Sequence, residues 1–241
     1  MKQYETVIQV MKEQGGFATL GQLNQLVDVK SWKTKTPFAT IRRIVQDKRF
    51  FFKIKPGLWA LKSYKDKISD LIPIDNSKSK EEIEIFDHSY YQGLVVEIGN
   101  FKGYHTFIPN QDKNKRFLNN TLGKCATLDV IHKFTYDEII DKAKTIDVIW
   151  FDDRKFPQSF FEVEHSTDFQ NSLLKMLELR SFYAKFNIIA DDKRFKEYQR
   201  KISYSAFNEL KGRVKFISYE KLSEYHSKSF EYFTLNNELQ I

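Results

Sequence analysis

Three acidic residues that the chain brings close together, Asp147, Glu162 and Glu164, carry the clearest chemical signal in the sequence. Glu162 and Glu164 are two positions apart in the segment 159–164, so both face the same side of an extended strand. Asp147 lies in the apolar segment 146–151, and residues 152–158 form a tight hairpin loop between the two segments. Pairing of these strands places all three carboxylates in one patch. Converging carboxylate oxygens are the ligands that Mg²⁺ and Mn²⁺ prefer, so the pattern predicts a metal site.

An exposed edge strand with two ordinary surface acids would show the same spacing. Phe160 and Phe161 beside the acids favour a buried hairpin instead, where paired acids are rare. His165 is a further candidate for this site, with an ordinary strand-end residue as the alternative, and Gln170 and Lys175 of the following helix are candidates to face it. The histidines and Cys125 lack the spacing of a zinc site, and no glycine-rich phosphate loop indicates a nucleotide cofactor.

The elements around the acids alternate between helical and extended patterns. Expected helices cover 88–100, 134–144, 168–184 and 193–202, and expected strands cover 104–108, 146–151, 159–164, 186–190 and 214–217. This order predicts an α/β (α+β) fold, in which a mixed sheet is flanked by helices.

The first quarter of the chain has a different composition. Residues 1–62 carry a net charge of +8, whereas residues 63–241 carry −1. Apolar periodicity predicts three helices, with Thr19 capping the second, Thr36 capping the third and Pro37 at its first position. An alternating segment at 50–54, a turn at 55–57 and a second segment at 58–61 predict a β-hairpin. A basic unit of this kind indicates binding to nucleic-acid phosphates, with a merely solubilising basic face as the alternative.

Two segments of this first unit, 35–43 (KTPFATIRR) and 50–61 (FFFKIKPGLWAL), resemble the HARE-HTH winged helix, which occurs in chromatin proteins and fused to bacterial restriction nucleases. The resemblance implies that the third helix enters the DNA major groove and that the hairpin contacts the backbone. A winged helix used only for protein contacts is the alternative. The expected DNA-binding residues are Lys33, Lys35, Thr36, Thr40, Arg42, Arg43, Lys53 and Lys55.

The acidic hairpin and its element order, over residues 85–220, resemble the PD-(D/E)XK nuclease superfamily. Asp147 matches the first acidic position and Glu162 the second, while Glu164 stands where most members have Lys. The resemblance implies a metal held by Asp147, Glu162 and the Val163 carbonyl, with Glu97 of the preceding helix as a further ligand. Glu164 takes the role of general base or additional ligand in this E-x-E variant.

These features predict a Mg²⁺-dependent endonuclease acting on double-stranded DNA, with Mn²⁺ as a substitute, of the type II restriction class. A nuclease that requires a modified base and a DNA-binding regulator with an inactive nuclease fold are the alternatives. Because cutting both strands usually takes two active sites, we expect a homodimer. The expected domains are 1–64 and 85–241, joined by a linker at 65–84. Without an apolar run or a signal peptide, we expect a cytoplasmic protein that does not contact a membrane.

Overall fold

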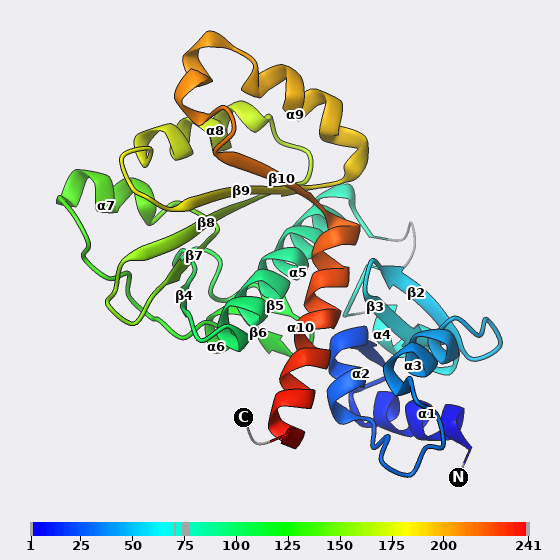
Figure 1. Ribbon diagram of the computed structural model, residues 1–241. Helices are drawn as coiled ribbons and strands as arrows, with labels where there is room; N and C mark the ends of the chain where they lie inside the picture. Colours follow the sequence, from blue (N-terminus) through cyan, green and yellow to red (C-terminus); the bar gives the residue numbers. More distant parts are fainter. Residues whose placement is uncertain (1, 70, 74–77, 240–241) are drawn as a thin grey trace. The chain divides into compact units, whose positions relative to one another are not determined.

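The computed structural model describes residues 2–69, 71–73 and 78–239 (Figure 1). The chain divides into two compact units, one formed by residues 1–83 with 223–241 and the other by residues 84–222. The C-terminal residues thus group with the first unit, whereas the sequence assigned them to the second domain. Part of the predicted linker 65–84 is helical, and its residues 70 and 74–77 lie outside the described residues.

The first unit combines short helices with an antiparallel sheet in the order β1-β3-β2. Its elements are α1 (Gln3–Glu13), β1 (Phe17–Thr19), α2 (Leu20–Leu26), α3 (Pro37–Val45), β2 (Phe51–Lys55), β3 (Leu58–Leu61), η1 (Lys62–Tyr64) and α4 (Lys65–Ser69). The helices and the hairpin lie where the sequence predicted them, and β1 was not predicted. Thr19 caps α2 by accepting a hydrogen bond from the Gln22 amide, whereas Thr36 precedes α3 without a side-chain cap.

A long helix, α10 (Tyr219–Leu239), was not predicted, and from Ser223 on it belongs to the first unit. It packs against α2 at Gly21, where an added Cβ would lie 2.6 Å from the Phe230 ring. The Asn24 amide donates to Ser227 Oγ at 3.3 Å and to a Glu231 carboxylate oxygen at 3.3 Å. The C-terminal helix is therefore an integral part of the basic unit.

The second unit is built around a mixed sheet in the order β10-β9-β8-β7-β4. β4 and β8 pair antiparallel with β7, whereas β8, β9 and β10 run parallel. The elements before the central strand are α5 (Lys80–Phe101), β4 (His105–Phe107), β5 (Arg116–Phe117), β6 (Asn120–Thr121), α6 (Leu122–Cys125), α7 (Asp137–Ala143) and β7 (Val148–Phe151). Those that follow are β8 (Pro157–Glu164), α8 (Phe169–Glu178), β9 (Lys185–Ala190), η2 (Asp192–Arg194), α9 (Phe195–Ile202), η3 (Ser205–Leu210) and β10 (Val214–Ser218).

Alternate strand residues face opposite layers of helices, which confirms the predicted mixed sheet flanked by helices. Ile149 and Phe160 join the core with Leu173 and Met176 of α8, whereas Trp150 donates a hydrogen bond from its indole to the Val95 carbonyl of α5. Figure 1 shows α8 and α9 on one side of the sheet and α5 on the other. The helix predicted at 168–184 is shorter, because α8 ends at Glu178. None of the described helices combines the length and apolar character that a membrane crossing needs.

Candidate active site

The three predicted acids converge at the end of β8. The β7–β8 register pairs Ile149 with Phe160, and its continuation places Asp147 opposite Glu162. The Asp147 amide lies 3.3 Å from Glu162 Oε1, and the Val163 amide donates to Asp147 Oδ2 at 2.7 Å. Asp147, Glu162 and Glu164 are 7%, 2% and 5% exposed, so the buried hairpin was the right alternative to a solvated edge strand.

Helix α8 adds a cation and a hydroxyl to the acids. Asp168 caps the helix by accepting a hydrogen bond from the Gln170 amide, and Ser172 and Lys175 then lie on one helix face. Lys175 Nζ lies 2.8 Å from Glu162 Oε2 and 3.1 Å from Oε1. The Ser172 hydroxyl contacts both Glu162 and Glu164, and the Thr167 hydroxyl contacts Glu164. Each carboxylate oxygen of Glu162 and Glu164 therefore has at least one hydrogen-bond partner that fixes its orientation.

Helix α5 contributes from the other side of the site. His88 Nε2 lies 3.5 Å from Asp147 Oδ1, and Glu84, one helical turn earlier, also lines the site. The Gln92 amide donates to the Asp147 carbonyl at 2.7 Å and to Asp112 Oδ2 at 3.0 Å. His88, Asp112 and Asp147 offer ligand atoms within 4.8 Å of one another, so Asp147 belongs to two sets of possible metal ligands. Neither His88 nor Asp112 was among the predicted site residues.

These side chains surround a pocket of about 360 Å³ that lies wholly within the second unit. Its lining includes Asp147, Glu162, Val163 and Glu164, together with Lys115, His165, Ser172 and Lys175. His165 Nδ1 lies 3.7 Å from Asp87 Oδ2 and 3.4 Å from the Tyr219 hydroxyl, so His165 is held at the wall of the pocket. The pocket thus combines buried acids with at least two cationic side chains.

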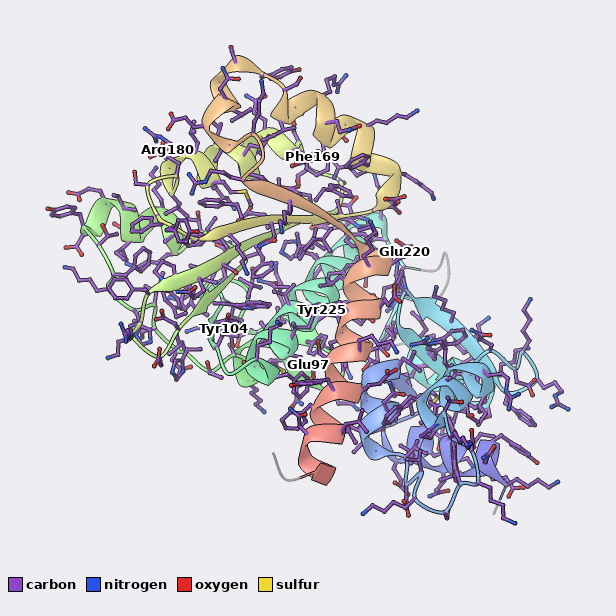
Figure 2. The ribbon with its side chains drawn as sticks, in the orientation of Figure 1. Glu97, Tyr104, Phe169, Arg180, Glu220 and Tyr225 are labelled. Carbon is purple, nitrogen blue, oxygen red and sulfur yellow. The ribbon has the colours of Figure 1, made fainter. Side chains whose placement is uncertain are left out.

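Glu97, predicted as a further metal ligand, does not line this pocket. It follows His88 by nine residues on α5, which places it half a turn round the helix and ~13 Å along its axis. Its charge contributes instead to raising the pKa of Cys125, which burial raises most. Figure 2 shows Glu97 on the part of α5 remote from Phe169, the first residue of α8. The α5 residues that line the pocket are Glu84, Ile85 and His88.

Burial and charge act differently on each group in the pocket. Burial opposes ionisation of Asp147, but the hydrogen bond and charge of His88 lower its pKa below the ordinary value. Burial, followed by repulsion from Asp147, raises the pKa of Glu162 well above its ordinary value despite the contact with Lys175. Burial also raises the pKa of Glu164, against its two hydroxyl contacts. Burial opposes the charge of Lys175, yet attraction to Glu162 raises its pKa. A cation bound between Asp147 and Glu162 would relieve their repulsion.

The predicted DNA-binding residues divide by exposure. Lys33, Lys35, Thr36, Arg43 and Lys53 are exposed, and Lys55 is half-buried. The prediction that Thr40 contacts DNA is wrong. Thr40 is 7% exposed and its hydroxyl donates to the Thr36 carbonyl at 3.1 Å, so its side chain faces the interior of the first unit. Arg42 pairs with Glu231 of α10 at 3.6 Å, which partly neutralises it.

Most of this chain matches a known protein family. The family model described as "Type II restriction enzyme NmeDI C-terminal domain" matches residues 71–237. The chain belongs to this family. The family agrees with the predicted relation to restriction endonucleases. The NmeDI C-terminal domain match includes every residue that lines the pocket and leaves α1 to α3 and the β2–β3 hairpin outside.

A curated protein with a similar sequence agrees with the family match. The type II restriction enzyme NmeDI of Neisseria meningitidis serogroup C is 25% identical over 174 residues, which cover 66% of this chain and 48% of that protein. The chain therefore spans about half the length of the curated relative that it matches. No solved structure matches the chain.

Proposed function

We propose that this protein is a metal-dependent endonuclease of the type II restriction class, which hydrolyses phosphodiester bonds in double-stranded DNA. The observation that carries the proposal is the convergence of Asp147, Glu162 and Glu164 with Lys175 in one pocket. The element order around them, with an acidic hairpin between α5 and α8, supports a PD-(D/E)XK nuclease fold. The name of the curated relative supports the restriction class.

The donor set fits a hard divalent cation. Asp147 and Glu162 present buried carboxylate oxygens that repel one another. A cation bound between them would attract both carboxylates and offset this repulsion. The Val163 amide donates to Asp147, and the carbonyl of a strand residue points to the same side as its amide. Asp147, Glu162 and the Val163 carbonyl would therefore hold the ion, with Mg²⁺ preferred and Mn²⁺ as a substitute. When bound, the ion would lower the pKa of a water and stabilise negative charge on the phosphate.

The other pocket side chains have roles that follow from their contacts. Lys175 brings a positive charge from α8, which the strand lacks because Glu164 occupies the usual Lys position. An ammonium at this place stabilises charge that develops on the phosphate. Burial holds the pKa of Glu164 above its ordinary value, which suits a group that accepts a proton from the attacking water. Ser172 and Thr167 fix the orientation of that carboxylate.

The first unit supports the DNA-binding part of the proposal. Its helix and strand order, with the sheet β1-β3-β2, supports a winged helix, and its surface carries the basic residues Lys33, Lys35, Arg43 and Lys53. In this arrangement α3 would enter the major groove and the β2–β3 hairpin would contact phosphates. Two copies of the chain, each with one pocket, would cut the two strands.

The test is a cleavage assay with the full chain, plasmid DNA and either Mg²⁺, Mn²⁺ or excess EDTA. We expect cleavage with either metal, none with EDTA, and ends that carry a 5′-phosphate. Glu162→Gln should abolish cleavage, whereas the matched Glu178→Gln, on the exposed side of α8, should leave it unchanged. Cleavage in EDTA, or equal rates for both variants, would contradict a metal-dependent site at Glu162.

A further inference from the structure

The segment between β4 and β7 contains a basic hairpin that the proposed mechanism does not use. Residues 110–125 carry Lys113, Lys115, Arg116 and Lys124 against one acid, Asp112, for a net charge of +3. Residues 63–241 as a whole carry −1, so this segment is a basic island in an otherwise acidic region. β5 and β6 pair antiparallel in it, with Leu118 and Asn119 forming the turn.

The hairpin is tied to the pocket at its first strand. Lys115, directly before β5, lines the pocket and pairs with Asp112 at 2.7 Å. Asp112 in turn accepts a hydrogen bond from the same Gln92 amide that donates to the Asp147 carbonyl. The base of the hairpin is thus positioned by the residues that position Asp147.

The hairpin is also anchored along α5. Phe117 is 2% exposed and lies against Gly93, where an added Cβ would come within 2.2 Å of its ring. The Ser89 hydroxyl donates to the Arg116 carbonyl at 2.8 Å. Such packing fixes the backbone of β5, so the side chain of Arg116 projects from a rigid support.

Arg116 itself is exposed, and its guanidinium is held in one orientation. Its Nε donates to the Leu118 carbonyl at 2.8 Å, and its terminal nitrogens make no hydrogen bond within the described part of the chain. Leu118 has a φ of 52°, a conformation that L-residues disfavour, and its buried side chain holds it there. The unusual turn therefore serves to place the carbonyl that orients Arg116. Pre-orienting an arginine fork reduces the entropy lost when it binds.

We propose that the β5–β6 hairpin enters the major groove of duplex DNA beside the pocket and that Arg116 reads a guanine there. A two-stranded ribbon fits the major groove, and an arginine fork matches the O6 and N7 acceptors of guanine. Lys124, which is exposed after β6, contributes a contact to a phosphate, whereas Lys113 donates to the Asp129 carbonyl and braces the segment. The inference rests on the proposed endonuclease function and adds a base-reading element within the nuclease unit, separate from α3.

The test compares Arg116→Ala and Arg116→Lys with Arg200→Ala, which removes an exposed arginine from α9. A randomised duplex library is digested with the wild-type full chain and Mg²⁺, and the cut ends are sequenced to define the preferred site. Binding to that duplex is then measured in Ca²⁺, and each variant is profiled on the library. Arg116→Ala should bind the preferred duplex about tenfold more weakly and lose discrimination at one G·C pair. Arg116→Lys, which keeps the charge, should lose the same discrimination.

The outcomes separate the two proposals. If the wild-type protein neither binds nor cuts any library member, the endonuclease function is overturned and this inference with it. A wild-type protein that cuts selectively, with an Arg116→Ala profile equal to that of Arg200→Ala, overturns the hairpin proposal alone. An even loss of affinity over all sequences makes Arg116 a phosphate contact and also overturns the base-reading role. Thermal unfolding of each variant shows that the compared proteins are folded.

Discussion

Charged side chains serve the two units of this protein in different ways. In the first unit, basic residues such as Lys35, Arg43 and Lys53 lie on the surface, where each keeps its hydration. In the second unit, Asp147 and Glu162 are almost fully buried and depend on His88 and Lys175 for compensation. Exposed charges attract a polyanion over a long range and are screened by salt, whereas buried charges act only on what enters the pocket.

This difference affects what each unit tolerates. Removing one surface charge costs little, because neighbouring side chains and water replace most of its interactions. Removing one buried charge leaves a partner unsatisfied in a site of low polarity, which costs far more. Substitutions in the pocket should therefore affect the chemistry strongly and DNA affinity weakly. Single substitutions on the surface of the first unit should change DNA affinity modestly and leave the chemistry intact.

The largest effect is expected from Asp147→Asn. It removes a charge that both sets of possible metal ligands share, so single-turnover cleavage should fall ~10³-fold or more, a loss of ~4 kcal/mol in transition-state stabilisation. DNA affinity should change little, because the steering charges of the first unit are intact. Asp153→Asn, in the exposed β7–β8 loop, is the matched control and should cleave at the wild-type rate. A parallel loss of DNA binding by Asp147→Asn would erase the proposed division between the units.

Lys175→Met should have the next largest effect. Loss of the ammonium 2.8 Å from Glu162 removes the cation that α8 supplies, and cleavage should fall on the order of 10²-fold. Lys142→Met, on the exposed surface of α7, makes the same chemical change outside the pocket and should have no effect. If Lys175→Met cleaves as fast as Lys142→Met, the lysine only balances the charge of Glu162.

The acidic hairpin could be predicted from sequence because its information is local. Strand alternation sets Glu162 and Glu164 on one face, and one tight loop sets the register of Asp147. Lys175, His88 and Asp112 belong to helices and loops whose orientation depends on tertiary packing, so only Lys175 was raised as a candidate. Glu97 was chosen from the correct helix, but its rotation about the helix axis could not be read without knowing which face meets the sheet.

The missed helix α10 and the misassigned Thr40 have related causes. The buried face of α10 includes Ser223, His226 and Ser227 among its apolar residues, so its periodic apolar signal is weak. Thr40 was counted as an exposed polar residue of α3, although its hydroxyl is satisfied by the preceding turn. In both cases buried polar side chains are satisfied by hydrogen bonds that a hydrophobic pattern does not report. The bond of Thr40 is local, whereas Ser223 donates to the Pro56 carbonyl and Ser227 accepts from Asn24.

A smaller effect, on stability rather than rate, tests whether α10 belongs to the basic unit. Gly21→Ala improves helix propensity in α2, yet the new Cβ would lie 2.6 Å from Phe230. Overpacking of this kind should lower the free energy of unfolding by ~1–3 kcal/mol, measured with denaturant on the full chain. Phe230→Leu in the same chain should recover part of that loss, as a double-mutant cycle would show. Additive effects of the two changes would mean that the strain arises elsewhere.

The smallest effect is expected from single charges on α3, and it distinguishes Arg43 from Arg42. Arg43 is exposed, whereas Arg42 is paired with Glu231 at 3.6 Å. If Arg43 contacts a phosphate, Arg43→Ala should reduce the log–log salt dependence of DNA binding by ~0.9. Arg42→Ala should reduce it less, because Glu231 already offsets that charge, and Lys12→Ala on α1 should leave it unchanged. Binding of the full chain to one duplex over a salt series gives all three slopes. Equal slopes for Arg43→Ala and Lys12→Ala would mean that α3 does not lie against the DNA backbone, and the basic surface would then attract DNA without docking it.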